Sequence, residues 1–259
     1  MNPPLAGIRI LVGRAWHQAS ALSAGLKVLG AEVIEVPFIE IRRPRSYTGL
    51  DSALKRIAEY DWLVLTSVNG MDAVAKRMRK LRINASQMQH LRIAAIGPAT
   101  ADAIRAIGLK VAVVPKRYVA ESVVAALRSK VARKLVLLAR AKVARDVIPR
   151  ELRKLGARVD VVEAYETLAP QSSRKKVRAL MSNFKRRPDV IIFTSSSAVT
   201  NFIQLLGRRG HSLHTGIRLA SIGPITSATL RENGLHPTIE AQRYTIPGLI
   251  SAIRKHFNK

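Results

Sequence analysis

Short apolar runs alternate with longer amphipathic stretches along the whole chain. The runs are too short for buried helices and are rich in Val, Ile and Leu, which favours strands. They are continuous rather than alternating, as expected of parallel strands that are buried on both faces. The predicted strands are residues 8–12, 33–36, 62–65, 92–96, 111–114, 135–138, 159–162, 190–193, 218–222 and 238–240.

The stretches between these runs have helical periodicity. In residues 18–30, Leu22, Leu26 and Leu29 fall on one face, and Gly30 stands where a helix-ending glycine belongs. Residues 144–156 show the same pattern. Regular alternation of strands and helices predicts an α/β fold in which helices cover both faces of parallel sheets.

The two halves of the chain repeat one another. The turn "GPAT" at 97–100 returns as "GPIT" at 223–226, 126 positions later, after a similar apolar run. Other segments recur in the same order: 8–36 resembles 134–162, and 60–74 resembles 188–202. The period is the size of a domain, so the sequence predicts two similar α/β domains that arose by duplication.

Composition narrows the class of protein. The chain has 259 residues, 47% of them hydrophobic, and no cysteine, which excludes disulfides and thiolate metal sites. The first residues lack the pattern of a signal peptide, and no apolar run is long enough to cross a bilayer. We therefore expect a cytoplasmic protein in a reducing compartment, without membrane contact.

The net charge is unusual. Lys and Arg total 44 against 17 acidic residues, which gives +27, and the excess is spread over both halves. Such a field attracts polyanions or a small substrate with several negative charges. The basic stretches at 76–82 and 174–187 leave nucleic acid open as a partner, but the low aromatic content of 5% favours solvated helix faces.

Three kinds of turn carry the candidate chemistry, each following a predicted strand. They are Arg14 and Arg140, the segments "TSVN" (66–69) and "TSSS" (194–197), and the two GPxT turns. Ligands of open parallel sheets gather at this edge, and free N–H groups at helix starts bind anions. Ordinary helix capping by Ser, Thr and Gly-Pro is the alternative interpretation of every single turn.

Other chemistries have little support. The sequence lacks a GxxxxGK[ST] phosphate loop, a GxGxxG turn and a GxSxG nucleophile elbow. The only close histidine pair, His211 and His214, lies in a polar loop and does not indicate a metal site. Two rival hypotheses remain open: a non-enzymatic polyanion binder, and an α/β enzyme for sugar phosphates or nucleotides.

Taken together, the motifs resemble those of the uroporphyrinogen-III synthase family. The resemblance covers essentially the whole chain, although the net charge is high for that family and the first strand ends in "VGR" where Thr-Arg is frequent. The segments that carry it are "YDWLVLTSVNG", "IAAIGPATADAI", "VVEAYET", "VIIFTSSSAVTNF" and "LASIGPITSATL".

This resemblance implies a bilobed fold in which the chain crosses between the domains twice. The implied first domain combines residues 1–37 with 168–259, and the second spans 41–164. Residues 38–40 and 165–167 would be the connectors, lying side by side. The ligand would bind in the cleft between the domains.

The implied reaction closes hydroxymethylbilane to uroporphyrinogen III with loss of water and inversion of ring D. No cofactor and no metal are implied. The resemblance implies a monomer, and a transient contact with the preceding enzyme of the pathway is compatible with it. The family points to Tyr165 as the proton donor. The implied substrate-binding residues are Arg14, Ser67, Asn69, Gly97, Thr100, Arg140, Ser195, Ser196, Ser197, Gly223 and Thr226.

Overall fold

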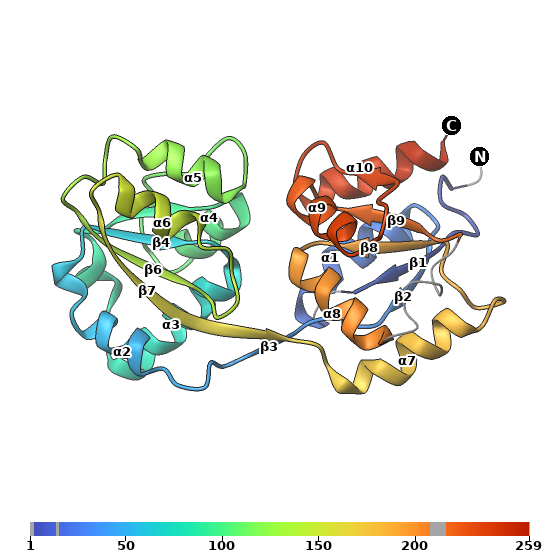
Figure 1. The fold of residues 1–259 in the computed structure, drawn as a ribbon, viewed down its shortest axis with the longest axis horizontal. Helices are drawn as coiled ribbons and strands as arrows, with labels where there is room; N and C mark the ends of the chain where they lie inside the picture. Colours follow the sequence, from blue (N-terminus) through green and yellow to red (C-terminus); the bar gives the residue numbers. More distant parts are fainter. Residues whose placement is uncertain (1–2, 14–15, 208–215, 259) are drawn as a thin grey trace. The chain divides into compact units, whose positions relative to one another are not determined.

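Two parallel-sheet α/β units make up the chain in the computed structural model, which describes residues 3–13, 16–207 and 216–258 (Figure 1). The first unit combines Met1–Glu40 with Leu168–Lys259, and the second is Ile41–Thr167. The chain therefore passes from one unit to the other twice. The predicted fold class, α/β with two similar parallel-sheet domains, is confirmed.

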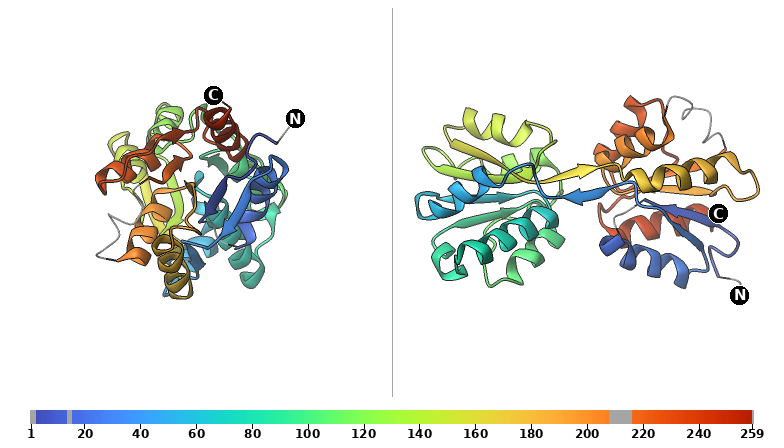
Figure 2. Two further views of the ribbon diagram at one scale, coloured as in Figure 1. Left: turned by 90° about the vertical axis from the view of Figure 1, so that its right-hand side faces the viewer. Right: turned by 90° about the horizontal axis from the view of Figure 1, so that it is seen from below.

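The first unit is built on a five-stranded sheet in the order β10-β9-β8-β1-β2. Neighbouring strands pair in parallel. Helices α1 and α10 pack on one face of this sheet, and α7, α8 and α9 lie on the other (Figure 2). The elements are β1 (Arg9–Val12), α1 (Trp16–Val28), β2 (Glu32–Glu35), α7 (Gln171–Ser182), β8 (Val190–Phe193), α8 (Ser196–Leu206), β9 (Arg218–Ser221), α9 (Pro224–Glu232), β10 (Ile239–Glu240) and α10 (Ile246–Phe257).

The second unit has a five-stranded sheet in the order β3-β7-β6-β4-β5. Helices α2, α3 and α4 cover one face, and α5 and α6 cover the other. Its strands are β3 (Glu40–Arg42), β4 (Trp62–Leu65), β5 (Arg92–Ala95), β6 (Leu135–Ala141) and β7 (Arg158–Leu168). Its helices are α2 (Thr48–Lys55), α3 (Val68–Leu81), α4 (Pro98–Arg105), α5 (Ala120–Leu127) and α6 (Val147–Lys154), with 3₁₀ turns η1 (Ile57–Glu59) and η2 (Ala85–Met88).

Burial explains why the strands read as continuous apolar runs. All four residues of β4 are buried, and so are all four of β8. Along β4 the side chains alternate between two cores: Leu63 and Leu65 pack with α2, α3 and α4, whereas Trp62 and Val64 pack with α5 and α6. A sheet covered on both faces needs apolar side chains at every position of its central strand.

The largest differences from the predicted strands are at β7, β3 and residues 111–114, and β6 also runs on to Ala141. Strand β7 continues to Leu168, so residues 165–167 lie within a strand, and the unpredicted β3 lies beside it. Phe38 packs its ring on Phe193 and Phe202, 5.9 and 4.7 Å between ring centroids, in the core of the first unit. Residues 111–114 form only an isolated parallel bridge, between Val113 and Ala94.

Asp61 directly precedes β4 and Asp189 directly precedes β8, and each aspartate joins its strand to a neighbouring one. The carboxylate of Asp61 accepts the backbone N–H of Leu135 at 2.8 Å, and that of Asp189 accepts the N–H of Arg9 at 2.8 Å. The Asp61 carbonyl also accepts the N–H of Arg92 at 3.0 Å. Duplication has therefore copied structural contacts as well as the turns.

Replacing Asp61 by alanine should lower the free energy of unfolding by about 1–3 kcal/mol, because the Leu135 amide loses its carboxylate partner in a buried sheet. Urea unfolding followed by tryptophan fluorescence measures this, since Trp62 is the next residue and is buried. The matched control is Asp102→Ala: the Asp102 side chain is 72% exposed and, among the described residues, its ion pair is with Arg105 one turn later in the same helix. Equal stabilities of the two variants would contradict this role.

Candidate active site

Tyr165 lies near the end of β7 and packs against the core that α2, α3 and α4 cover. A β-bulge sets this orientation: Arg140 pairs with Glu163, but Ala141 pairs with Tyr165, so Ala164 has no opposite residue on β6. Successive side chains of a strand normally point to opposite faces, and a bulge re-aims the next one. Ala164 and Tyr165 therefore face the same core.

The Tyr165 phenol meets the start of α3. Its oxygen lies 3.0 Å from the hydroxyl oxygen of Ser67, the N-cap residue, which also accepts the backbone N–H of Gly70 at 3.0 Å. Asn69 forms a further hydrogen bond with the phenol. The Ser67 hydroxyl can donate its single hydrogen to the Tyr165 oxygen, which leaves the phenol proton for another acceptor.

Burial raises the pKa of the Tyr165 phenol above its ordinary value of 10.0, and the hydrogen bonds of Ser67 and Asn69 oppose that rise. The phenol is therefore protonated at neutral pH. A half-buried, protonated phenol at the carboxyl edge of a parallel sheet can act as a general acid toward a ligand at that edge.

The GPxT turn of the second unit starts helix α4. Gly97 is the N-cap without a side-chain capping bond, Pro98 is the first helical residue, and Thr100 is 4% exposed. Among the residues that the structure describes, the Thr100 hydroxyl has no hydrogen-bond partner. In that part of the chain, Ser23 and Asn201 are the only residues with a fully buried side-chain N or O atom that lacks a hydrogen-bond partner. The Thr100 hydroxyl is not among them, so it is still accessible to solvent.

The first unit repeats this arrangement at helix α9. Gly223 is the N-cap, Pro224 begins the helix, and Thr226 is again 4% exposed. Its hydroxyl likewise lacks a partner within the described ranges. Neither threonine caps its helix, so the capping interpretation does not explain either hydroxyl.

The three serines after β8 have different tasks. Ser195 caps α8 by accepting the Ala198 N–H at 3.2 Å, and its hydroxyl lies 3.0 Å from that of Ser197. Ser196 accepts the Thr229 hydroxyl at 2.8 Å, which ties the start of α8 to helix α9. The side chain of Ser196 is therefore occupied, and its backbone N–H is the group available to a ligand.

Arg140 is also occupied. It donates to the carboxylate of Asp146 at 2.6 Å and to the carbonyl of Arg145 at 3.0 Å, which holds the turn after β6. An anionic ligand would have to replace that carboxylate. Arg14, its counterpart in the repeat, lies outside the described residues, as do His211 and His214.

Sequence reasoning missed an ion pair beside Tyr165. The ammonium of Lys142 lies 2.9 Å from Glu166, and the Lys142 amide donates to the Tyr165 carbonyl at 2.9 Å. The hydrogen bond from Lys142 holds the pKa of Glu166 below its ordinary value. Glu166 could have been predicted as a site residue, because it directly follows Tyr165. No sequence pattern around Lys142 indicates that it lies beside Tyr165.

Two further observations concern the whole described chain. Nowhere in residues 3–13, 16–207 and 216–258 do three or more His, Cys, Asp or Glu side chains gather as metal ligands would. None of the helices described there is long and apolar enough to cross a membrane.

Known proteins with similar sequences share one description. The family model described as uroporphyrinogen-III synthase HemD matches residues 20–251. The uroporphyrinogen-III synthase of Synechococcus elongatus is 38% identical over 257 residues, which covers 97% of this chain and 96% of the relative.

Solved structures agree on the fold. A mutant uroporphyrinogen III synthase of Thermus thermophilus superimposes with a TM-score of 0.70 at 15% identity, covering 97% of this chain and 99% of that one. Uroporphyrinogen-III synthetase of Helicobacter pylori gives 0.59 at 16% identity, over 96% and 99%. With the family match and the Synechococcus relative, these findings show that the chain belongs to the uroporphyrinogen-III synthase family and is an enzyme with that activity.

Proposed function

We propose that the chain closes hydroxymethylbilane to uroporphyrinogen III with the Tyr165 phenol as proton donor. The observation that carries the proposal is the position of this phenol: it is protonated, half-buried and hydrogen-bonded to the N-cap serine at the carboxyl edge of a sheet. A proton donor is what the first step requires, because a hydroxide ion is a poor leaving group.

In that step the bond between the hydroxymethyl carbon and its oxygen breaks, and both electrons stay with the oxygen. Tyr165 supplies the proton, and water leaves. The resulting azafulvene cation is attacked by the substituted carbon of ring D, which gives a spiro intermediate. That intermediate opens and recloses with ring D inverted, and the proton released from the ring carbon restores the phenol. The balance is one water lost.

The substrate carries acetate and propionate groups on every ring, and the helix starts supply donors for them. We propose that the backbone N–H groups at the starts of α3, α4, α8 and α9 bind these carboxylates, with Thr100 and Thr226 adding hydroxyl donors. The proposed substrate-binding set is Arg14, Ser67, Asn69, Gly97, Thr100, Arg140, Ser195, Ser196, Ser197, Gly223 and Thr226. Much of the catalysis is positioning, because the linear substrate also closes without an enzyme.

A quenched-flow comparison tests the proposal. Hydroxymethylbilane mixed with the protein should lose one water and become a macrocycle faster than in buffer alone, as followed by mass spectrometry after rapid quenching. A non-enzymatic polyanion binder would leave the rate of closure at the spontaneous value, and that result would sink the proposal.

The pH dependence follows from the raised pKa of Tyr165. Tyr165 can donate a proton only while its phenol is protonated. Because its pKa is raised above 10.0, the phenol loses its proton only at higher pH. After subtraction of spontaneous closure, kcat should stay level from about pH 7 to about pH 9 and fall only above about pH 10. Circular dichroism at each pH checks that the protein stays folded. An alkaline decline centred near pH 8 would show that another group donates the proton.

A further inference from the structure

An arginine–tyrosine pair belongs to the internal repeat as well. The dipeptide stands at 117–118 and again at 243–244, the same 126 positions apart as Gly97 and Gly223. The first copy leads into α5 and the second into α10. Both therefore lie on the loop that leaves the carboxyl edge of a sheet, next to the turn that starts α4 or α9.

Each tyrosine ring lies directly against the glycine of its GPxT turn. A Cβ added to Gly97 would come within 3.2 Å of the Tyr118 ring, and one added to Gly223 within 2.8 Å of the Tyr244 ring. The backbone does not require glycine here, because φ is −162° at Gly97 and 166° at Gly223, which is extended backbone that any residue adopts. The glycines make room for the rings.

The hydroxyl groups of these tyrosines form no hydrogen bond with any described residue. Tyr118 and Tyr244 are both half-buried, and neither hydroxyl has a hydrogen-bond partner among the residues that the structure describes. Packing on the glycine uses the ring alone, and phenylalanine would fill the same space. Each unit thus has, at one helix start, a tyrosine and a buried threonine whose hydroxyls form no hydrogen bond with any described residue.

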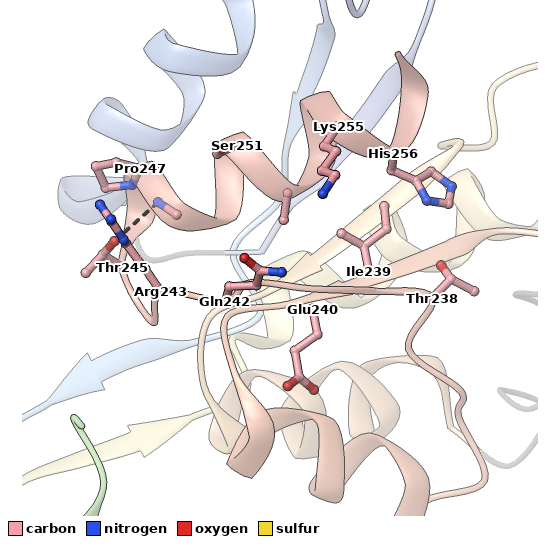
Figure 3. Close-up of a pocket in the computed structure, with 12 residues that line it drawn as sticks. Thr238, Ile239, Glu240, Gln242, Arg243, Thr245, Pro247, Ser251, Lys255 and His256 are labelled. Carbon is pink, nitrogen blue, oxygen red and sulfur yellow. Dashed lines mark hydrogen bonds between the residues drawn. The ribbon is translucent and has the colours of Figure 1, made fainter. Parts of the chain in front are cut away.

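An arginine directly precedes each of these tyrosines in the sequence. Arg117 and Arg243 are exposed, and within the described ranges neither forms an ion pair. Arg243 lines a groove of about 650 Å³ with Gln242, Lys255 and His256. Figure 3 shows the carboxylate of Glu240 directed away from α10, where it accepts the Ser227 hydroxyl. Neither Tyr244 nor Gly223 is among the residues that line this groove, so it receives the Arg243 charge beside the tyrosine and not at its ring.

We propose that Tyr118 and Tyr244, each with its preceding arginine, are a matched pair of substrate-holding residues for the carboxylate-bearing pyrrole rings, an inference that rests on the proposed function. The phenol donates to a ring carboxylate, the tyrosine ring packs against the pyrrole, and the neighbouring guanidinium attracts the substrate's further carboxylates. The ligand class fits the duplication, because hydroxymethylbilane repeats one chemical unit and the chain repeats one set of donors.

Tyr118→Phe and Tyr244→Phe test this directly, because only the hydroxyl is lost. Each should raise KM by about 5–10-fold and leave kcat within about twofold. Because each tyrosine is proposed to hold a different ring, the double variant should show roughly the product of the two increases. Titration with uroporphyrin III, the stable oxidised product, should show a matching loss of affinity by fluorescence.

The control is Tyr47→Phe. Tyr47 is a half-buried tyrosine of the second unit, outside the repeated arginine–tyrosine pair, and it stacks on Arg77 at 4.6 Å from ring centroid to guanidinium carbon. Its replacement should leave KM at the wild-type value. Wild-type KM in both Tyr118→Phe and Tyr244→Phe, with Tyr165→Phe slow, would overturn the inference and leave the proposed function intact. A wild-type protein that forms no type III macrocycle would instead overturn the proposed function.

Discussion

Tyr165→Phe should lower kcat by about 10²-fold, the lower end of the effect of losing a general acid. The lower end applies because the hydroxymethyl group departs partly unaided and water can enter as a substitute donor. The ring keeps its packing against the core of the second unit, so the protein should stay folded and bind product normally. The type I isomer should gain share, because spontaneous closure competes with the slowed reaction.

Tyr60→Phe is the matched control. Tyr60 belongs to the same core, and its phenol donates one hydrogen bond to Asp160 at 2.6 Å, five residues before Tyr165 on the same strand. Each variant loses one tyrosine hydroxyl from the second unit, which should lower the free energy of unfolding by about 1 kcal/mol. Only Tyr165→Phe should lose activity. Wild-type kcat and normal product in Tyr165→Phe would remove Tyr165 from the chemistry and leave positioning as the whole mechanism.

Thr100→Val and Thr226→Val should each lower kcat/KM by roughly 10–100-fold, the equivalent of about 1.5–3 kcal/mol for a hydrogen bond to a charged group. Valine keeps the shape of the threonine side chain. The melting temperature should barely move, because neither hydroxyl caps its helix or bonds to another described residue. Steady-state kinetics and thermal melts on the same preparations measure both quantities.

Thr48→Val controls for the loss of a threonine hydroxyl elsewhere. Thr48 begins α2, and its hydroxyl lies 2.7 Å from that of Ser46 in an exposed position. This variant should keep wild-type kinetics. The site assignment would be rejected if both Thr100→Val and Thr226→Val kept the wild-type kcat/KM, whatever their stability.

The strands could be predicted because their burial leaves a direct mark on the sequence. Strand β4 was predicted with its observed bounds, since all four of its residues are buried. Strand β7 is longer than the predicted strand at 159–162, because its second half has one buried residue, Ala164, among half-buried and exposed ones around a bulge. Strand β3 contains no buried residue and left no apolar run to detect.

Some features of the candidate site could also be predicted from the sequence, and others could not. Ser67, Gly97 and Gly223 stand at helix starts, which local residue types reveal. The meeting of Tyr165 with Ser67 depends on the pairing of β6, β7 and β4 and on the bulge, which no local pattern encodes. The resemblance to the family supplied Tyr165. The packing of Tyr118 on Gly97 became visible only in three dimensions.

The identity of the product tests the central claim most directly. Hydroxymethylbilane should be incubated with the purified protein to full conversion, oxidised, and the uroporphyrin isomers separated by chromatography. Buffer alone gives type I, the isomer of uncatalysed closure. We predict type III as the dominant isomer at enzyme concentrations far below that of the substrate. Type I alone, at the share found in buffer, would contradict the account.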